Sequence, residues 1–253
     1  MQERNIEDYS TRYVQSGFEK YQVQYRRRKV LEIIEAYAPK NILEVGCGTE
    51  SLAKYYSAFS SFTIVEPAAS FCAGARETFS KDSRVQIVQD CLENVSEILQ
   101  KTHFDAVIVS GLLHEVGQPE VLLQHASTVG KHARLIHFNV PNANSLHIAW
   151  AMASGLIDNK LALSPRAVAL QQHTRFDRDI LDGMLVANGF TVIEQGDYFV
   201  KPFNHAKMEL CMKHGILDTS LLDGLYSLSA IMPGFGSEIY ANCVVDANAS
   251  HSV

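Results

Sequence analysis

The chain lacks paired cysteines, a long apolar segment and an excess of positive charge, and each absence excludes a class of protein. Its five cysteines are scattered without a C-x-x-C pair, which argues against a disulfide framework and a zinc site and is typical of a reducing compartment. No apolar run approaches the roughly 20 residues of a membrane-spanning helix. The first residues also lack the apolar core of a signal peptide. We therefore expect a cytoplasmic protein with no membrane partner.

The chain also has no excess of positive charge. The chain has 22 basic residues against 28 acidic ones, a net charge of −6 at pH 7, so it offers no general electrostatic attraction to nucleic acid. The only basic run is Arg26–Lys29. On a helix these four side chains would point around most of the circumference, and we interpret the run as a solvated face. Nucleic acid is not an expected partner.

The chain does contain short apolar runs alternating with helical patterns over 253 residues, enough for one large α/β domain. The predicted strands are Ile42–Val45, Ser61–Val65, Val85–Gln89, Phe104–Ser110, Ala133–Val140, Thr191–Gln195 and Glu238–Val245. The predicted helices are Tyr21–Tyr37, one restarting over Glu50–Lys54, Pro119–Val129, Ser145–Leu156, Asp177–Asn188, Asn204–Lys213 and Thr219–Ile231.

This order predicts a single α/β domain over residues 1–253. The fold class is a Rossmann-like, doubly wound sheet of seven strands, mostly parallel with the last strand antiparallel, with helices on both faces. Residues 1–30 and an insertion at residues 143–175 are predicted to form a helical lid, because insertions at the carboxyl edge of such a sheet commonly cover a substrate.

The rest of the chain is organised around Asn41–Glu50, an apolar strand followed by a glycine turn. Gly46 and Gly48 lack a Cβ at two places where a ligand must approach the backbone, and such a unit binds a nucleotide-like ligand at the carboxyl end of a strand. A dinucleotide site needs a third glycine where this chain has Ser51. Glu44 would also repel a pyrophosphate. A ligand that carries an ammonium and a sulfonium, and no phosphate, suits the turn better.

Two further acids follow the next strands. Glu66, with Pro67 behind it, stands 22 positions after Glu44, and an acid at this spacing can accept both ribose hydroxyls. The alternative is a solvent-facing carboxylate at a strand end. Asp90 follows the third strand and can accept the amino group of adenine, while Cys91 and Leu92 offer backbone and apolar contacts to the ring. We interpret Cys91 as a packing residue because no basic partner adjoins it.

These motifs resemble, in order and over about residues 25–245, those of the class I S-adenosylmethionine-dependent methyltransferases. The resemblance implies S-adenosylmethionine as cofactor, S-adenosylhomocysteine as product and no metal. It places Glu44 and both turn glycines at the methionine end, Glu66 on the ribose and Asp90 on the adenine. The predicted cofactor site is Glu44, Gly46, Cys47, Gly48, Glu66, Pro67, Asp90, Cys91, Leu92 and Ser110.

A looser similarity indicates the chemical class of the methyl acceptor. Val140–His147 and the later His-Thr-x-Phe-Asp segment at residues 173–177 resemble bacterial methyltransferases found among genes for glycans and other secondary products. The resemblance implies methylation at an oxygen or nitrogen of a small molecule such as a sugar, a natural product or a similar metabolite. The Asp/Asn-Pro-Pro-aromatic turn of enzymes that methylate nucleic-acid bases is missing.

A hydroxyl acceptor needs a base, and a histidine of near-neutral pKa is suitable. His114 follows the fourth strand and should face the crevice, whereas His147 and His173 lie in the predicted lid insertion. These three are the candidate catalytic residues, with His114 weighed evenly against a structural role. His137, inside the fifth strand, is predicted to be a hydrogen-bonded core residue. An amine acceptor would need no particular base.

Other activities stay open at this stage. The His114–Glu115 pair is not a metalloprotease motif, because Gln118 stands where the second histidine of H-E-x-x-H belongs. A catalytically inactive cofactor-binding subunit is the first alternative, since cofactor motifs can survive while an acceptor pocket decays. An NAD(P)-dependent oxidoreductase is the second, and Ser51 counts against it. A homodimer is compatible with the sequence.

Overall fold

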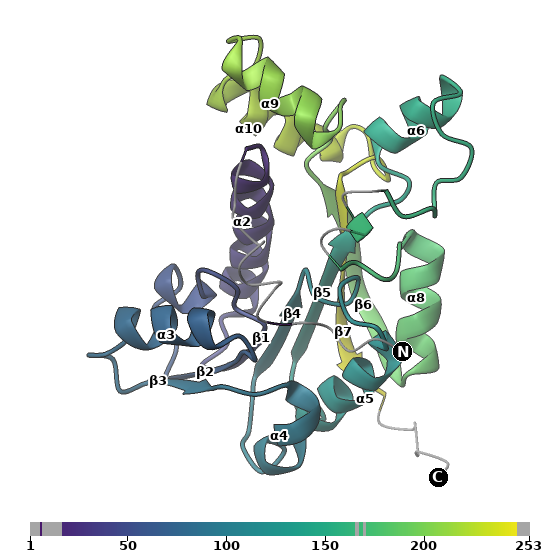
Figure 1. Ribbon diagram of the computed structural model, residues 1–253. Helices are drawn as coiled ribbons and strands as arrows, with labels where there is room; N and C mark the ends of the chain where they lie inside the picture. The colour runs from purple at the N-terminus through teal and green to yellow at the C-terminus, as the bar shows by residue number, and fades with distance from the viewer. Residues whose placement is uncertain (1–5, 7–16, 165–166, 169–170, 247–253) are drawn as a thin grey trace.

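The structure is a computed structural model that describes residues 6, 17–164, 167–168 and 171–246. Seven strands form one sheet in the order β3-β2-β1-β4-β5-β7-β6, shown in Figure 1. The first five strands pair in parallel, and β7 runs antiparallel between β5 and β6. The predicted fold class is therefore confirmed. The strands are β1 (Asn41–Val45), β2 (Ser61–Val65), β3 (Val85–Val88), β4 (Ala106–Ser110), β5 (Leu135–Pro141), β6 (Phe190–Tyr198) and β7 (Glu238–Val245).

The sheet carries a buried apolar layer on each face, because successive side chains of a strand point to opposite sides. Ile42 and Ile108 belong to the layer under α2 and α10, whereas Leu43 and Val109 belong to the layer under α5 and α8. Figure 1 shows α2 on one side of the sheet and α5 and α8 on the other. The longer helices are α2 (Glu19–Tyr37), α3 (Ala69–Thr78), α4 (Leu92–Leu99), α5 (Pro119–Val129), α6 (Leu146–Ala153), α8 (Arg178–Ala187), α9 (His205–Lys213) and α10 (Thr219–Ser227).

One predicted helix is wrong. After the glycine turn the chain forms only a short 3₁₀ helix, Leu52–Lys54, where a helix over Glu50–Lys54 was expected. Ser51 caps this turn by accepting a hydrogen bond from the Ala53 amide. The first two residues of the expected helix, Glu50 and Ser51, therefore lie outside helical conformation.

The topology opens a crevice beside β1. The strand order reverses between β1 and β4, and ligands of open α/β sheets bind outside the carboxyl ends of the strands at such a point. The insertion after β5 and the helices between β6 and β7 gather at this end, where Figure 1 shows α6, α9 and α10 beyond the sheet. Residues 1–5 and 7–16 of the predicted lid lie outside the described residues.

Candidate functional site

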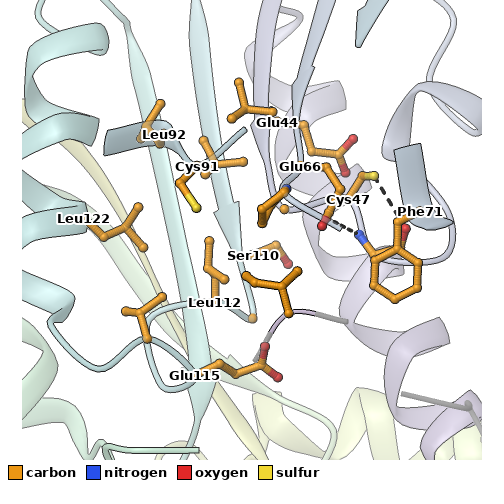
Figure 2. A pocket seen from close by; sticks show the side chains of 18 of the residues that line it. Glu44, Cys47, Glu66, Phe71, Cys91, Leu92, Ser110, Leu112, Glu115 and Leu122 are labelled. Atoms are coloured by element: carbon orange, nitrogen blue, oxygen red, sulfur yellow. Dashed lines mark hydrogen bonds between the residues drawn. The ribbon is translucent and has the colours of Figure 1, made fainter. Parts of the chain in front are cut away.

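Two cavities lie at the carboxyl edge of the sheet. The first has a volume of about 260 Å³, and Figure 2 shows side chains that line it. All ten residues predicted to bind the cofactor line this cavity. The structure brings them together from the ends of β1, β2, β3 and β4, although their separate contacts to a cofactor stay predictions. Lining residues beyond the predicted ten include Arg26, Arg27, Phe71, Leu112 and Glu115.

The glycine turn needs its two glycines. Gly46 has φ +78° and Gly48 has φ +56°, conformations that residues with a Cβ rarely adopt. The Gly46 amide donates to the Val65 carbonyl at 2.8 Å, which joins the turn to β2. A Cβ on Gly46 would lie 3.5 Å from Leu112 Cδ2 across the cavity. The turn therefore leaves a cradle that a side chain would fill, as expected for a ligand that approaches the backbone.

Glu44 is directed back at its own loop. Its carboxylate accepts hydrogen bonds from the Ser51 hydroxyl at 2.5 Å and from the Leu52 amide at 3.1 Å. Burial raises the pKa of Glu44 to about 7, against these two hydrogen bonds, which lower it, and the nearby charge of Glu66 raises it further. Glu44 thus fixes the shape of the turn. The sequence predicted a contact between Glu44 and the cofactor and did not predict this structural role.

This pKa predicts an unusual pH dependence of stability. Glu44 has a higher pKa in the folded chain than its ordinary value of 4.5, so its ionisation favours the unfolded state as the pH rises from 4.5 to 7. Glu44→Gln removes that loss, and the free energy of unfolding of the variant relative to the parent should rise across this window by up to about 3 kcal/mol. Urea unfolding at pH 5, 6, 7 and 8 measures the difference. A constant difference would contradict the burial argument.

The two other predicted acids are oriented by backbone amides. Glu66 is buried and accepts from the Gly48 amide at 3.2 Å and the Ala68 amide at 2.9 Å. Asp90 Oδ1 accepts from the Cys91 amide at 2.8 Å and from Asn94 Nδ2 at 2.7 Å. Such bonds fix each carboxylate at its strand end, where carboxylates are suited to ribose hydroxyls and to the adenine amino group. The residues present fit an adenosyl ligand with a sulfonium centre.

Cys47 lines this cavity and is 8% exposed. Burial, reinforced by the charges of Glu44 and Glu66, raises the pKa of the Cys47 thiol far above its usual value. The thiolate is the nucleophilic form of cysteine, so Cys47 is unsuited to nucleophilic chemistry at neutral pH. All five cysteines of the chain are free thiols.

The second cavity, of about 780 Å³, lies between α2, the 143–175 insertion and the chain around α9. His114 and His147 both line it. His114 is buried, with its Nε2 3.7 Å from Glu115 Oε1. His147 Nδ1 lies 3.0 Å from Ser145 Oγ, and burial lowers the pKa of His147 to about 2, with further lowering by Lys201, His205 and Arg175. A group of such low pKa is a weak base, so His114 is the better candidate.

His173 does not join the other two. Its side chain is exposed and lines neither cavity, and its backbone amide donates to the His114 carbonyl at 2.9 Å. The prediction that it contributes a catalytic side chain has no support in this geometry. His137 is fully buried, with Nδ1 2.7 Å from Asn242 Oδ1, and burial lowers its pKa to about 4. It is the core histidine that strand alternation predicted.

The two cavities meet at Arg26 and Glu115, which line both of them. Arg26 forms a forked ion pair with Glu238, with Nη2 to Oε1 at 2.6 Å and Nε to Oε2 at 2.9 Å. Glu238 also accepts from the Tyr198 hydroxyl at 2.5 Å and from Gln22 Nε2 at 2.9 Å. Burial raises the pKa of Glu238, but the charge and hydrogen bonds of Arg26, together with the Tyr198 hydrogen bond, bring it below its ordinary value.

The interpretation of Arg26–Lys29 as a solvated face is therefore wrong for Arg26. Its side chain is 15% exposed and faces a glutamate 212 positions away in the chain. Arg27 also lines the first cavity and pairs with Glu50 at 2.7 Å. Neither the Arg26–Glu238 pair nor its place between the cavities could be found from local sequence, because the partner stands at the start of β7.

Comparison with known proteins agrees with this geometry. The family model described as "Methyltransferase domain" matches residues 19–195. The chain belongs to this family, and the fold and motifs place it among the class I S-adenosylmethionine-dependent methyltransferases.

Curated relatives match a smaller segment. The chain is 32% identical over 115 residues to the polyketide synthase component of lovastatin nonaketide synthase from Aspergillus terreus, a match that covers 42% of this chain and 4% of that protein. It is 29% identical over 140 residues to the hybrid PKS-NRPS synthetase fsa1 from a Fusarium species, covering 52% of this chain and again 4% of the relative. The chain thus corresponds to a small part of each relative's length.

Solved structures share the fold. A Thermotoga maritima methyltransferase, described as a possible histamine N-methyltransferase, aligns with TM-score 0.57 and 15% identity over 95% of this chain and 99% of that one. The [4+2]-cyclase SpnF aligns with TM-score 0.57 and 16% identity over 87% and 80%. The plantazolicin methyltransferase BamL, solved with S-adenosylhomocysteine, aligns with TM-score 0.56 and 13% identity over 94% and 89%. At these identities the likeness is one of fold.

No group of three or more histidine, cysteine or acidic side chains within residues 6, 17–164, 167–168 and 171–246 could hold a metal ion. No helix in the same part of the chain is both long enough and apolar enough to cross a membrane.

Proposed function

We propose that the protein transfers a methyl group from S-adenosylmethionine in the first cavity to an oxygen or nitrogen of a small molecule in the second. The observation that carries the proposal is the shared wall. Arg26 and Glu115 line both cavities, so a donor and an acceptor bound on either side would lie next to each other. In-line displacement needs such an arrangement, and holding the two reactants together supplies much of the rate enhancement.

The cofactor supplies a methyl group on a sulfonium, which is already activated for displacement. The chain's residues then have to bind, orient and exclude water. Glu66 and Asp90 are suited to hold the ribose and the adenine, and their backbone hydrogen bonds fix both carboxylates before a ligand arrives. The Arg26–Glu238 pair holds α2 against β7 at the junction of the two cavities, the wall formed by Arg26 and Glu115. His114 is placed to orient a hydroxyl acceptor or accept its proton.

The names of similar proteins support a small acceptor. Relatives are components of polyketide synthases, and similar folds include a plantazolicin methyltransferase and a possible histamine N-methyltransferase. Both oxygen and nitrogen acceptors are compatible with this set. Our proposal keeps the expected cytoplasmic location, which the five free thiols support.

A cofactor-binding protein without methyl transfer is the second candidate. The similar fold named as a [4+2]-cyclase favours keeping it, because a fold can host several activities. Calorimetric titration with S-adenosylmethionine, S-adenosylhomocysteine and NADH tests the site first. Micromolar binding of the two sulfur compounds and none of NADH is expected, whereas binding of NADH alone would overturn the proposal. Release of S-adenosylhomocysteine in a screen of hydroxyl and amine acceptors then separates enzyme from binding protein.

The role of His114 can be tested with an acceptor found in that screen. For a hydroxyl acceptor we expect His114→Ala to lower kcat by about 100-fold, the typical contribution of a general base, with the affinity for S-adenosylhomocysteine unchanged because His114 lines only the second cavity. His173→Ala is the matched control and should keep full turnover. Full turnover of His114→Ala would remove this residue from the reaction.

A further inference from the structure

The second cavity combines cationic groups with an unusually open apolar helix. Helix α6 reads Leu-His-Ile-Ala-Trp-Ala-Met-Ala, yet it has no buried residue. Trp150, 50% exposed, lies with its ring centroid 5.4 Å from that of Phe203, and both residues line the cavity. An apolar helix face that stays uncovered beside a cavity is suited to an apolar ligand.

Arg175 is a cation of this cavity wall without an acidic partner among the described residues. It is half-buried, and within the described part of the chain its guanidinium makes one hydrogen bond, from Nη1 to the Lys160 carbonyl at 3.0 Å, and no ion pair. Burial lowers the pKa of Arg175, and no neighbouring acid acts to raise it. A half-buried cation without a counter-ion loses part of its hydration, and an anionic ligand would offset that loss.

Two further basic residues line the same cavity. Lys201 is buried, and its Nζ lies 3.2 Å from Gln22 Oε1. Two residues earlier in the chain, Phe199 has a left-handed backbone conformation with φ 61°. His205 pairs with Glu19 at 3.1 Å. Together with Arg175, these are the charged groups that act on His147, and all of them are basic. Three basic groups therefore act on His147 against one acid, Glu19, which interacts with two of them, so the cluster keeps a net positive charge.

No acid that the structure describes in the cavity wall acts on Arg175, although the charge of Glu19 interacts with Lys201. Glu19 is paired with His205 and Glu238 with Arg26, while Glu115 lies beside His114. Asp158 is exposed. None of these four forms an ion pair with Arg175.

We propose that the acceptor is an amphipathic anion, whose negative group is bound by Arg175 and Lys201 while an aromatic or aliphatic body packs against Trp150 and Phe203. This inference rests on the proposed function for the assignment of the second cavity to the acceptor. It adds the chemical class of the acceptor and two residues that select it.

A pair of fluorescent probes tests the anion site without knowledge of the acceptor. 1-Anilinonaphthalene-8-sulfonate and N-phenyl-1-naphthylamine share an apolar body, and only the first carries a sulfonate. Trp150 is the single tryptophan of the chain and lines this cavity, so energy transfer from it reports a bound probe. Saturating S-adenosylhomocysteine keeps the probe out of the first cavity. We expect the sulfonate probe to bind at least tenfold more tightly than the neutral one, as a charge-assisted hydrogen bond predicts.

The variants assign the selectivity to Arg175. Arg175→Gln should lower the affinity for the sulfonate probe about tenfold and leave the affinity for the neutral probe unchanged. Arg175→Lys should restore part of the lost affinity. The control is Arg134→Gln, at an exposed arginine outside both cavities, which should change neither affinity. Equal affinities of the two probes for the parent protein would overturn the inference, as would full selectivity in Arg175→Gln or the absence of energy transfer from Trp150. Calorimetry with S-adenosylhomocysteine measures ligand affinity at the first cavity separately. A wrong assignment of the cofactor site is thereby distinguished from a wrong assignment of the anion site.

Discussion

Gly46→Val should abolish binding of S-adenosylmethionine. At φ +78° a β-branched residue is strained, and the new side chain would project toward Leu112, whose Cδ2 lies 3.5 Å from the position of a Cβ alone. The turn could relieve the strain only by moving the Gly46 amide away from the Val65 carbonyl, which would displace the floor of the first cavity. We expect at least a thousandfold loss of affinity, about 4 kcal/mol, measured by calorimetry with S-adenosylhomocysteine.

A matched control separates the cavity from backbone strain. Gly215, between α9 and α10, has φ +66°, lies in open space and lines neither cavity. Gly215→Val imposes a similar conformational cost there, so it should lower stability somewhat and leave cofactor affinity unchanged. Normal binding by Gly46→Val would show that the ligand does not approach this turn, and the assignment of the first cavity to the cofactor would then be wrong.

The sheet and the first cavity could be predicted because their signals are local. The central strands β1, β2 and β4 are short, mostly apolar runs. Residues that line the cavity stand at or just after the strand ends, as Gly46 does after β1 and Asp90 after β3. Parallel strands bring these ends to one edge. A strand-by-strand interpretation therefore also gives the residues that share the cavity.

The junction and the second cavity could not be predicted in this way. Arg26 lies in a run of four basic residues, Arg26–Lys29, whose members differ in burial, and its partner Glu238 is 212 positions away. His147 and His173 are both in the insertion, yet of the two only His147 lines the cavity, because the backbone amide of His173, and not its ring, lies against His114. Such distinctions depend on how separate segments pack, and no local pattern encodes that.

Arg26→Met should be the most destabilising change among the charged residues of α2. It leaves Glu238, 2% exposed, without the cation that compensates its burial, and breaking a buried pair in this way costs about 3–5 kcal/mol. Arg27→Met is the matched control on the neighbouring residue. Its partner Glu50 is 36% exposed, and exposed pairs contribute at most about 1 kcal/mol. Urea unfolding of both variants at pH 7 measures the contrast.

The pH dependence of this loss identifies its cause. In the parent, Arg26 holds the pKa of Glu238 below its ordinary value of 4.5, so the pair's stabilisation is present at neutral pH and is lost only as the pH falls through that lowered pKa. Without Arg26, burial dominates and raises the pKa of Glu238, which then takes up a proton on mild acidification and relieves the unpaired charge. The destabilisation of Arg26→Met should therefore shrink between pH 7 and pH 5, and Glu238→Gln added to it should recover much of the loss at pH 7. A loss that is equal at both pH values would mean that Arg26 contributes packing, and that its charge is not what holds α2 to β7.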